Sequence, residues 1–380
     1  MSYETILANA RIVLPTDVVT GTLVVRGGRI AEICEGRGVA YGAVDCGGDL
    51  VLPGLIELHT DNLEKHVSPR PGVTWPLPGA VMAHDSQIAA AGITTVCDAL
   101  TIGDLWGNPA RSVALRGLVQ ALDETASAGA LRSEHFVHLR AELSHGNLLD
   151  TFASLADHPR VKVVTLMDHT PGQRQFADVA QYRRYYQGKN GVSDTEMDAL
   201  LERHREAQRR NAVPNRARIV EIARGRDVLI GSHDDACADH VAEAAACGAA
   251  FTEFPTTPEA ADAAHARGIA ILLGAPNVVR GGSHSGNVSA LDLARADRID
   301  VLSSDYVPSS LIHGVLRLHR DGGMTLPAAV ATATATPAAL LGLKDRGQLA
   351  TGTRADILRI SDESDVPVVR AVWREGTRVA

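Results

Sequence analysis

The 380-residue sequence has few aromatic residues and no excess of positive charge. Its five Phe, six Tyr and three Trp are too few for a platform on which nucleic-acid bases stack. Lys and Arg number 37 against 45 Asp and Glu, which gives a net charge of −8. This balance disfavours a general nucleic-acid binder and a protein that binds anionic membranes. We therefore expect neither nucleic acid nor a membrane among its partners.

Paired cysteines and long apolar runs are also missing from the sequence. The cysteines are scattered and form no CxxC pair: Cys34, Cys46, Cys97, Cys237 and Cys247. This spacing excludes a disulfide scaffold and a cysteine zinc cluster, and it suits a reducing compartment. No apolar run approaches the roughly 18 residues of a membrane-spanning helix, and the first ten residues do not resemble a signal peptide. We expect a cytoplasmic protein.

Apolar segments of strand length alternate with helix-like segments through the middle of the chain. The predicted strands are Gly54–His59, Thr94–Ala99, Phe136–Leu143, Val161–Asp168, Val228–His233, Ala250–Phe254, Ile269–Gly274 and Asp300–Asp305. Such alternation predicts a parallel sheet with helices outside, and eight units over about 250 residues predict a (β/α)8 barrel. A doubly wound sheet is the alternative, but no GxGxxG follows the first strand.

Both ends of the chain read as short strands. Gly27-Gly28 separates two strand-like segments and suits a hairpin turn, because both turn positions favour a positive φ. Strand and turn patterns return in Arg346–Ile360 and Val368–Val379. We expect a small β-sandwich formed by residues 1–50 with 346–380, and a barrel domain over residues 51–345.

Two further segments have a distinctive composition. The connection Thr170–Asp227 joins the fourth and fifth predicted strands and carries more basic than acidic residues, in contrast to the whole chain. It is either a solvated helical excursion, with a helix over Thr195–Arg210, or a lid over a site. The Ala- and Thr-rich stretch Ala328–Leu341 is predicted to be one packed helix.

Polar residues follow the predicted strands at the point where each strand ends. These ends read His59-Thr60-Asp61, Glu142, Asp168-His169, His233-Asp234-Asp235 and Ser304-Asp305. In a (β/α)8 barrel the carboxyl ends of the strands carry the ligand site. Residues i and i+2 share one face of a strand, so His59 and Asp61 can point together into the mouth of the barrel, with Glu57 beneath them. The same parity places His138, Arg140 and Glu142 on one polar face.

Imidazoles and carboxylates in this arrangement predict one or two divalent cations. Zinc is the first expectation, with manganese or iron as alternatives. The expected ligands are His59, Asp61, Glu142, His169, His233 and Asp305. Glu142 is the best-placed carboxylate to bridge two cations, and Asp305 can also accept a proton from water. A single His at a strand end is more often structural, as we read His84 and His135, but polar residues at five strand ends together favour a site.

A second group of residues is suited to an anionic ligand. Basic side chains and paired glycines lie in loops after the strands, at Arg174, Lys189, Arg280, Gly281 and Gly282, with Lys65 after the first strand. Glycine lets backbone N–H groups approach an oxyanion, and Arg binds phosphate through two parallel hydrogen bonds. Each residue alone is an ordinary surface residue, but three basic loops at one end of a barrel indicate an anion. His284 follows the same glycines and is expected to donate a proton or hydrogen bond there.

The motifs resemble those of the amidohydrolase superfamily. The resemblance lies in LPGLIELH (52–59) and GTRADI (352–357), and more specifically in ELHTDNLEKH (57–66), SHDDA (232–236), EFPTT (253–257), LMDHTPGQRQF (166–176) and GAPNVVRGGSHSGN (274–287). The second group is similar to the diphosphatases of phosphonate breakdown. Many superfamily members carry His-x-His after the first strand and a modified Lys as metal bridge. Here the first pair is His59 and Asp61, and Lys162 stands at the start of its strand.

This resemblance implies hydrolysis of a small ribosyl triphosphate, α-D-ribose 1-methylphosphonate 5-triphosphate, to the 5-phosphate and pyrophosphate in the carbon–phosphorus lyase pathway. Two alternatives stay open: a hydrolase of a cyclic amide or N-acyl substrate on the same scaffold, and a non-catalytic scaffold for other proteins of the pathway. A homodimer is left open as well. The expected catalytic residues are Asp305, Glu142 and His284.

Overall fold

The computed structural model describes residues 4–380 except 71, 104–108, 175–178, 181, 184–186, 188–192 and 284–285, and residues 109–114 as backbone only. Lys189 and His284 therefore lie outside the described residues. The chain divides into two compact units: Met1–Asp98 with Ala121–Phe136 and Leu273–Ala380, and Ala99–Gln120 with Val137–Leu272.

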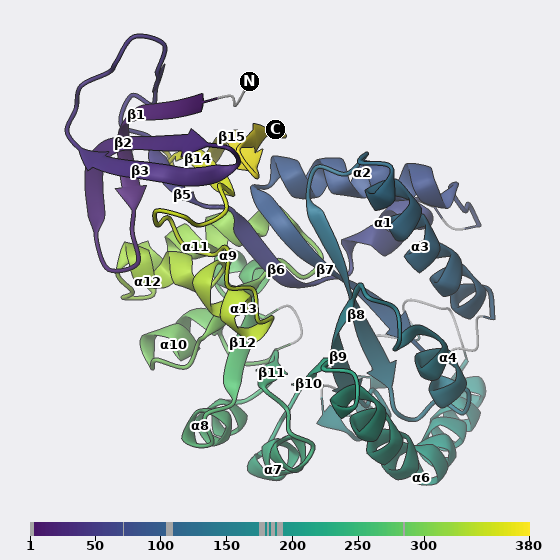
Figure 1. Ribbon diagram of the computed structural model, residues 1–380. Coiled ribbons are helices and arrows are strands. Elements are labelled where there is room, and N and C mark those ends of the chain that lie inside the picture. The colour runs from purple at the N-terminus through teal and green to yellow at the C-terminus, as the bar shows by residue number, and fades with distance from the viewer. Residues whose placement is uncertain are drawn as a thin grey trace. The chain divides into compact units, whose positions relative to one another are not determined.

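A parallel sheet of eight strands confirms the predicted barrel. Its strands are β6 (Leu55–Thr60), β7 (Ile93–Ile102), β8 (Glu134–Glu142), β9 (Val161–Met167), β10 (Leu229–His233), β11 (Phe251–Glu253), β12 (Ala270–Gly274) and β13 (Val301–Ser303). They follow one another in chain order, and a parallel bridge between Thr60 and Asp305 joins the first strand to the end of the last. Each strand overlaps one of the eight segments predicted from the sequence. Strands β6 to β12 are labelled in Figure 1.

Helices follow most of these strands. They are α1 (Asn62–Val67), α2 (Leu77–Ala90), α3 (Pro109–Ser127), α4 (Leu148–Leu155), α6 (Asp194–Arg224), α7 (Ala238–Ala246), α8 (Pro258–Ala266), α9 (Ala275–Arg280), α10 (Ala290–Arg295), α11 (Ser310–Asp321), α12 (Leu326–Ala331) and α13 (Ala335–Leu340). Local sequence explains where several begin. Thr257 accepts a hydrogen bond from the Ala260 N–H, and Pro258 supplies the fixed φ that suits the first turn of α8.

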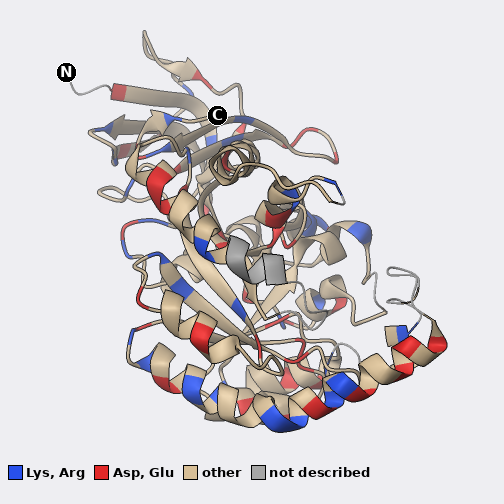
Figure 2. Ribbon diagram, turned by 90° about the vertical axis from the view of Figure 1, so that its right-hand side faces the viewer, with Lys and Arg blue, Asp and Glu red and all other residues tan. Residues whose placement is uncertain are grey.

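The predicted helix in the basic excursion is longer than expected. Ser193 and Glu196 form a reciprocal capping box at the start of α6, and the helix continues through Pro214 to Arg224. Acidic and basic residues are interspersed along it (Figure 2), as is typical of a helix exposed to solvent. One face is nevertheless buried, including Met197 and Leu201, which pack against Tyr182.

The single helix predicted over Ala328–Leu341 is wrong. The chain instead forms α12 and α13, separated by residues 332–334. The hydroxyls of Thr332 and Thr334 donate to the carbonyls of Ala329 and Val330, at 2.7 and 2.8 Å. Side chains that bond the preceding backbone in this way compete with helix continuation, which explains the break.

A second sheet contains strands from both ends of the chain, as predicted. The strands are β1 (Glu4–Val13), β2 (Val18–Arg26), β3 (Arg29–Glu35), β4 (Val44–Asp45), β5 (Leu50–Pro53), β14 (Ile357–Ser361), β15 (Val368–Arg374) and β16 (Thr377–Arg378). Gly27 and Gly28 have φ of +56° and +77° in the β2–β3 turn. The two termini lie at this sheet (Figure 1), whose core includes Leu7, Ile12 and Trp373. The domain boundaries at residues 50/51 and 345/346 stay a prediction.

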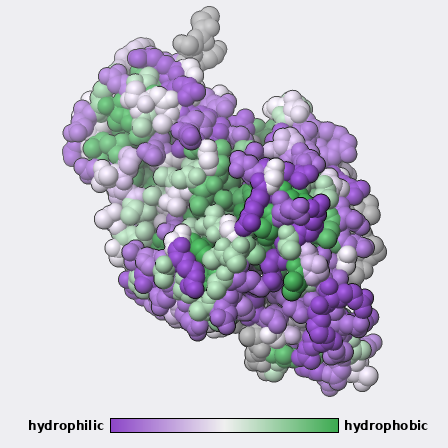
Figure 3. Space-filling model, turned by 60° about the horizontal axis from the view of Figure 1, so that its bottom comes forward, coloured by the Kyte–Doolittle hydropathy of each residue, from purple (hydrophilic) through white to green (hydrophobic). Residues whose placement is uncertain are grey.

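Hydrophilic side chains cover most of the face shown in Figure 3, and apolar ones gather in smaller patches. Among the residues that the structure describes, none of the helices combines the length and hydropathy needed to cross a bilayer.

Close packing between β10 and β11 generates a test of the fold. A Cβ atom added at Gly231 would lie 2.5 Å from Cζ of Phe251, its partner residue in the parallel register. We expect Gly231→Ala to lower the free energy of unfolding by about 1–3 kcal/mol, because the fully buried ring must shift. Gly38→Ala is the matched control, since its Cβ would meet no atom within 4 Å. Equal stability of the two variants in urea unfolding would contradict this packing.

Candidate functional site

Acidic and imidazole side chains alternate along the carboxyl ends of β8 to β11. His169 follows β9, and its Nδ1 lies 2.7 Å from Glu142 Oε2 at the end of β8. Its Nε2 lies 3.5 Å from Asp234 Oδ2, and the same oxygen is 2.8 Å from His233 Nδ1. One ligand atom from each of His169, His233 and Asp234 falls within 4.8 Å of the other two. The structure thus brings together Glu142, His169 and His233, as the sequence predicted.

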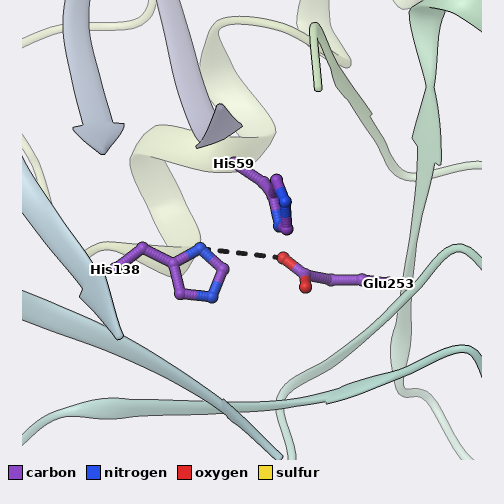
Figure 4. Close-up of side chains that lie close together, drawn as sticks. All are labelled: His59, His138 and Glu253. Atoms are coloured by element: carbon purple, nitrogen blue, oxygen red, sulfur yellow. Dashed lines mark ion pairs between the residues drawn. The ribbon is translucent and has the colours of Figure 1, made fainter. Parts of the chain in front are cut away.

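Two further residues extend this row and were not named as candidate ligands from the sequence. His138 of β8 lies with its Nδ1 3.8 Å from Glu253 Oε1, and Glu253 Oε2 is 3.9 Å from His233 Nε2. His138 Nε2 is 2.8 Å from the Thr165 hydroxyl. Figure 4 draws His138 and Glu253 together with His59. Glu253 is the register partner of His233. Applying the strand-end argument to β11 as well would have identified it.

The electrostatics of this row are dominated by the mutual stabilisation of opposite charges. Burial opposes protonation of His169, but the charges of Glu142 and Asp234 outweigh it and raise its pKa to about 9. Burial also opposes ionisation of Asp234, yet His233 and His169 hold its pKa well below the ordinary range. The pKa of Glu253 is raised by burial. A proton on His169 therefore lies between two carboxylates, in a place that also suits a cation.

Strained backbone accompanies these side chains. Asp234 and Phe254 follow β10 and β11 directly with φ of +55° and +53°. The left-handed region is unfavourable for a bulky residue such as Phe, so the surrounding contacts must hold it there. The ring of Phe254 packs edge to face on His233, with 5.5 Å between centroids.

His59, Asp61 and Asp305 form a second group, within the other unit. The backbone N–H groups of Asp305 and Asp61 donate to the carbonyls of His59 and Asp305, at 3.2 and 3.3 Å. The Thr60 hydroxyl donates to Asp305 O at 2.7 Å. Asp305 itself has a φ of +52°. The end of β6 and the end of β13 are thus joined by hydrogen bonds. The backbone of Asp305 therefore lies next to that of His59 and Asp61, the other two predicted ligands of this group.

Glu57 supports this junction from below. The Glu57 carboxylate accepts hydrogen bonds from the backbone N–H groups of His59 and Ser304, at 2.7 and 2.6 Å, and from the Ser303 hydroxyl. Burial raises the pKa of Glu57 to about 7, against the effect of these hydrogen bonds.

The residues predicted to bind an anion have varied surroundings. Arg174 is buried, and its guanidinium pairs with Asp235 and with Glu243, the latter at 3.0 Å. Asp235 thus forms an ion pair with Arg174, and the carboxylate in contact with His233 is that of Asp234. Lys65 donates to Tyr306 O, and its amino group lies 5.3 Å from the centre of the Tyr306 ring. Their phosphate contacts stay predictions.

Arg280 and the following glycines form an exposed corner. Arg280 ends α9 and is exposed, and Gly281 closes the helix with a φ of +78°. A Cβ atom at Gly281 or Gly282 would meet no atom within 4 Å, so there is open space beside this backbone. The N–H groups of Gly281 and Gly282 nevertheless donate to the carbonyls of Val278 and Asn277, at 3.3 and 3.0 Å. Lys162, at the start of β9, is exposed, as expected from its position in the strand.

A separate buried cluster joins α2 to β7 and β8. His84 Nε2 and His135 Nδ1 each lie 2.7 Å from one oxygen of Asp98, and His135 Nε2 is 3.3 Å from Asp85 Oδ1. All four side chains are at most 1% exposed. Distances of 2.7 Å between nitrogen and oxygen are those of hydrogen bonds, so we read this cluster as a hydrogen-bond network although its atoms also meet the spacing of a metal site.

Protonation in this network follows from its geometry. Both ring nitrogens of His135 face carboxylates, so both donate. Burial opposes the charged form, but Asp98 and Asp85 outweigh it and raise the pKa of His135 to about 9. Burial likewise opposes ionisation of Asp98, but His135 and His84 lower its pKa to about 2. Burial lowers the pKa of His84, which is therefore neutral with its proton on Nε2.

Comparison with known proteins gives a full-length relative. The chain is 45% identical over 376 residues to alpha-D-ribose 1-methylphosphonate 5-triphosphate diphosphatase of Escherichia coli strain K12, covering 98% of this chain and all of that protein. No protein-family profile matches. Solved structures share the fold at low identity. One is an amidohydrolase, with 14% identity, a TM-score of 0.61 and coverage of 99% and 98%. Another is 5-methylcytosine deaminase from Klebsiella pneumoniae, with 15% identity, a TM-score of 0.65 and the same coverage.

The buried histidines generate a pH prediction. The pKa of His135 rises from 6.5 to about 9 on folding, so its contribution to stability is complete below pH 6.5 and is lost as the pH rises through 9. We expect the free energy of unfolding of metal-free protein to fall across this window, with His135 contributing on the order of 3 kcal/mol. The free energy of unfolding of His135→Gln, measured by urea titration, should fall less steeply over the same pH range. A wild-type stability that is flat or rising from pH 6.5 to 9.5 would refute the assigned charge.

Proposed function

Because the chain belongs to the alpha-D-ribose 1-methylphosphonate 5-triphosphate diphosphatase family, we propose that it hydrolyses that ribosyl triphosphate to the 5-phosphate and pyrophosphate. The observation that carries this proposal is the identity of 45% over the full length of both chains. The row of buried imidazoles and carboxylates supports it, because phosphoanhydride hydrolysis depends on positioning and charge stabilisation.

The donor set fits a divalent cation. Imidazole nitrogens and carboxylate oxygens are the ligands that zinc, manganese and iron take, and atoms of His169, His233 and Asp234 have the spacing of a metal site. We propose zinc, in one or two sites, with ligands His59, Asp61, Glu142, His169, His233 and Asp305. All follow strands of one parallel sheet, and in a (β/α)8 barrel such ends line one rim. When bound, the cation lowers the pKa of a water and stabilises charge on phosphate oxygens.

The roles of the chain's own residues follow from their contacts. Glu142 holds Nδ1 of His169, so Nε2, which here faces Asp234 at 3.5 Å, is the nitrogen that would bind a cation after losing its proton. Its predicted role as a bridge between two cations requires a free carboxylate oxygen and stays a prediction. Asp305 accepts the proton of the water that attacks the α-phosphorus. The bond from that phosphorus to the bridging oxygen breaks, and pyrophosphate leaves.

Charge on the leaving pyrophosphate needs a cationic surrounding. Arg280 is exposed and suits this role. Gly281 and Gly282 are proposed beside it, although their N–H groups here donate to carbonyls of α9. Lys189 and His284 are proposed from sequence alone. Arg174 is proposed in the same role, although its present partners are two carboxylates. A cytoplasmic location is proposed from the five free cysteines, and a homodimer is left to measurement.

Product analysis tests the proposed reaction. Phosphorus NMR of purified protein with the ribosyl triphosphate should show pyrophosphate appearing together with the 5-phosphate. Orthophosphate as the first product would place the attack at the γ position. Nucleoside triphosphates, dihydroorotate and hydantoin complete the panel, and turnover of the cyclic amides alone would overturn the phosphate assignment. Protein with no bound metal and no turnover at all would favour the pathway scaffold.

Asp305→Asn tests the proposed base. Asparagine keeps the size of the side chain and tolerates the positive φ, so we expect kcat to fall by about 10²–10⁴-fold while bound metal is retained. Asp297→Asn is the matched control, because Asp297 is exposed and has a φ of +60°. Metal content and kcat are measured for both. A loss of less than tenfold in Asp305→Asn would show that another group takes the proton.

A further inference from the structure

The buried network around His84 and Asp98 continues to α1, the short helix that follows Asp61. The amide nitrogen of Asn62 is 3.1 Å from His84 Nδ1 and donates to Gln87 Oε1 at 2.9 Å. Because His84 carries its proton on Nε2, toward Asp98, its Nδ1 accepts from Asn62. His66 Nε2 also lies 2.9 Å from Gln87 Oε1 and therefore donates to it. Asn62 and His66, one helical turn apart, thus fasten α1 to α2.

The other side of α1 is tied to the segment that carries Asp305. The N–H of Asp61 donates to Asp305 O, and the amino group of Lys65 donates to Tyr306 O. The helix thus connects two anchors. On one side lie His84 and Gln87 of α2, and on the other lies the chain just beyond β13.

Alone, α1 has little to hold it in place. It spans six residues, and Asp61 at its start makes no side-chain capping bond. Helices shorter than about 12 residues are marginal in water and depend on tertiary contacts. The direction of Asp61 and the register of α1 against Asp305 therefore depend on the contacts of Asn62, His66 and Lys65.

The network itself is an expensive way to stabilise a fold. Asp85, Asp98, His84 and His135 are all removed from water, and well-packed apolar residues often serve stability as well as a buried charged group does. Unlike apolar packing, the charged network fixes the orientation of the hydrogen bonds. It fixes the His84 tautomer, and the tautomer determines which group Asn62 can bond.

We propose that His84 is a positioning residue for the catalytic centre, because it holds Asn62 at the start of α1 and thereby sets the places of Asp61 and Asp305. This inference rests on the proposed function for the roles of those two carboxylates. It assigns His84 no contact with substrate.

Two substitutions of His84 separate its two bonds. A glutamine amide reaches about as far as Nε2, so His84→Gln keeps a donor to Asp98 and loses the acceptor for Asn62. An asparagine amide reaches about as far as Nδ1, so His84→Asn keeps the acceptor and loses the bond to Asp98. We expect His84→Gln to lower kcat by about 10²-fold with KM changed by less than about threefold, as a small misplacement of reacting groups does. His84→Asn should lower Tm while keeping kcat within about fivefold of wild type.

Further variants keep the test decisive if His84→Asn does not fold. Asn62→Leu, which removes the donor, should lose as much kcat as His84→Gln, and the double variant should lose no more than either alone. Ile88→Ala is the control for stability, because it removes buried apolar volume from α2 and no hydrogen bond. It should lower Tm and leave kcat unchanged. Additive losses in the double variant, or equal kcat losses in the two His84 variants, would overturn the proposal.

Zinc affinity gives a readout that needs no substrate. If Asp61 and Asp305 are ligands, His84→Gln should weaken zinc binding about tenfold, whereas Ile88→Ala should not. Unchanged zinc affinity together with unchanged kcat would refute the positioning role. Wild-type protein that binds zinc but releases no pyrophosphate would refute the proposed reaction, and the affinity of the His84 variants would still decide the positioning role.

Discussion

The pairing of imidazole with carboxylate at the ends of neighbouring strands is the interaction on which the candidate site depends. Glu142, His169, Asp234, His233 and Glu253 alternate between carboxylate and imidazole along four strands, so each group lies beside groups of the other kind. Without a partner, any one of these buried groups would be costly. The parallel register makes the alternation feasible, because consecutive strands present their last residues at the same height.

This arrangement also explains why local geometry at the strand ends is unusual. Asp234, Phe254 and Asp305 adopt positive φ directly after their strands. A regular continuation of the strand would carry the next residue to the opposite face. The left-handed turn instead redirects the chain, and at Asp234 it accompanies a side chain that contacts two imidazoles. Backbone strain therefore occurs at the candidate site, as it does in many active sites.

The sequence was sufficient to predict the barrel and the strand ends at which the candidate site lies. Apolar runs ending in His, Asp or Glu locate the strand ends, which is why His59, His169, His233 and Asp305 could be named. Contacts between distant residues could not be predicted in this way. Arg174 reads as a free cation in its loop, and only the fold shows that Asp235 and Glu243 neutralise it. The break at Thr332–Thr334 depended on hydroxyls bonding the backbone, a choice that composition does not reveal.

The terminal sheet has a consequence for synthesis on the ribosome. β5 lies between β1 and β14, with Leu52 opposite Leu358. The first three strands can pair as soon as they emerge, but the open edge of β5 has no partner until more than 300 further residues have been translated. For that interval an apolar strand edge is exposed, which makes the nascent chain a natural client for chaperones that cover such edges.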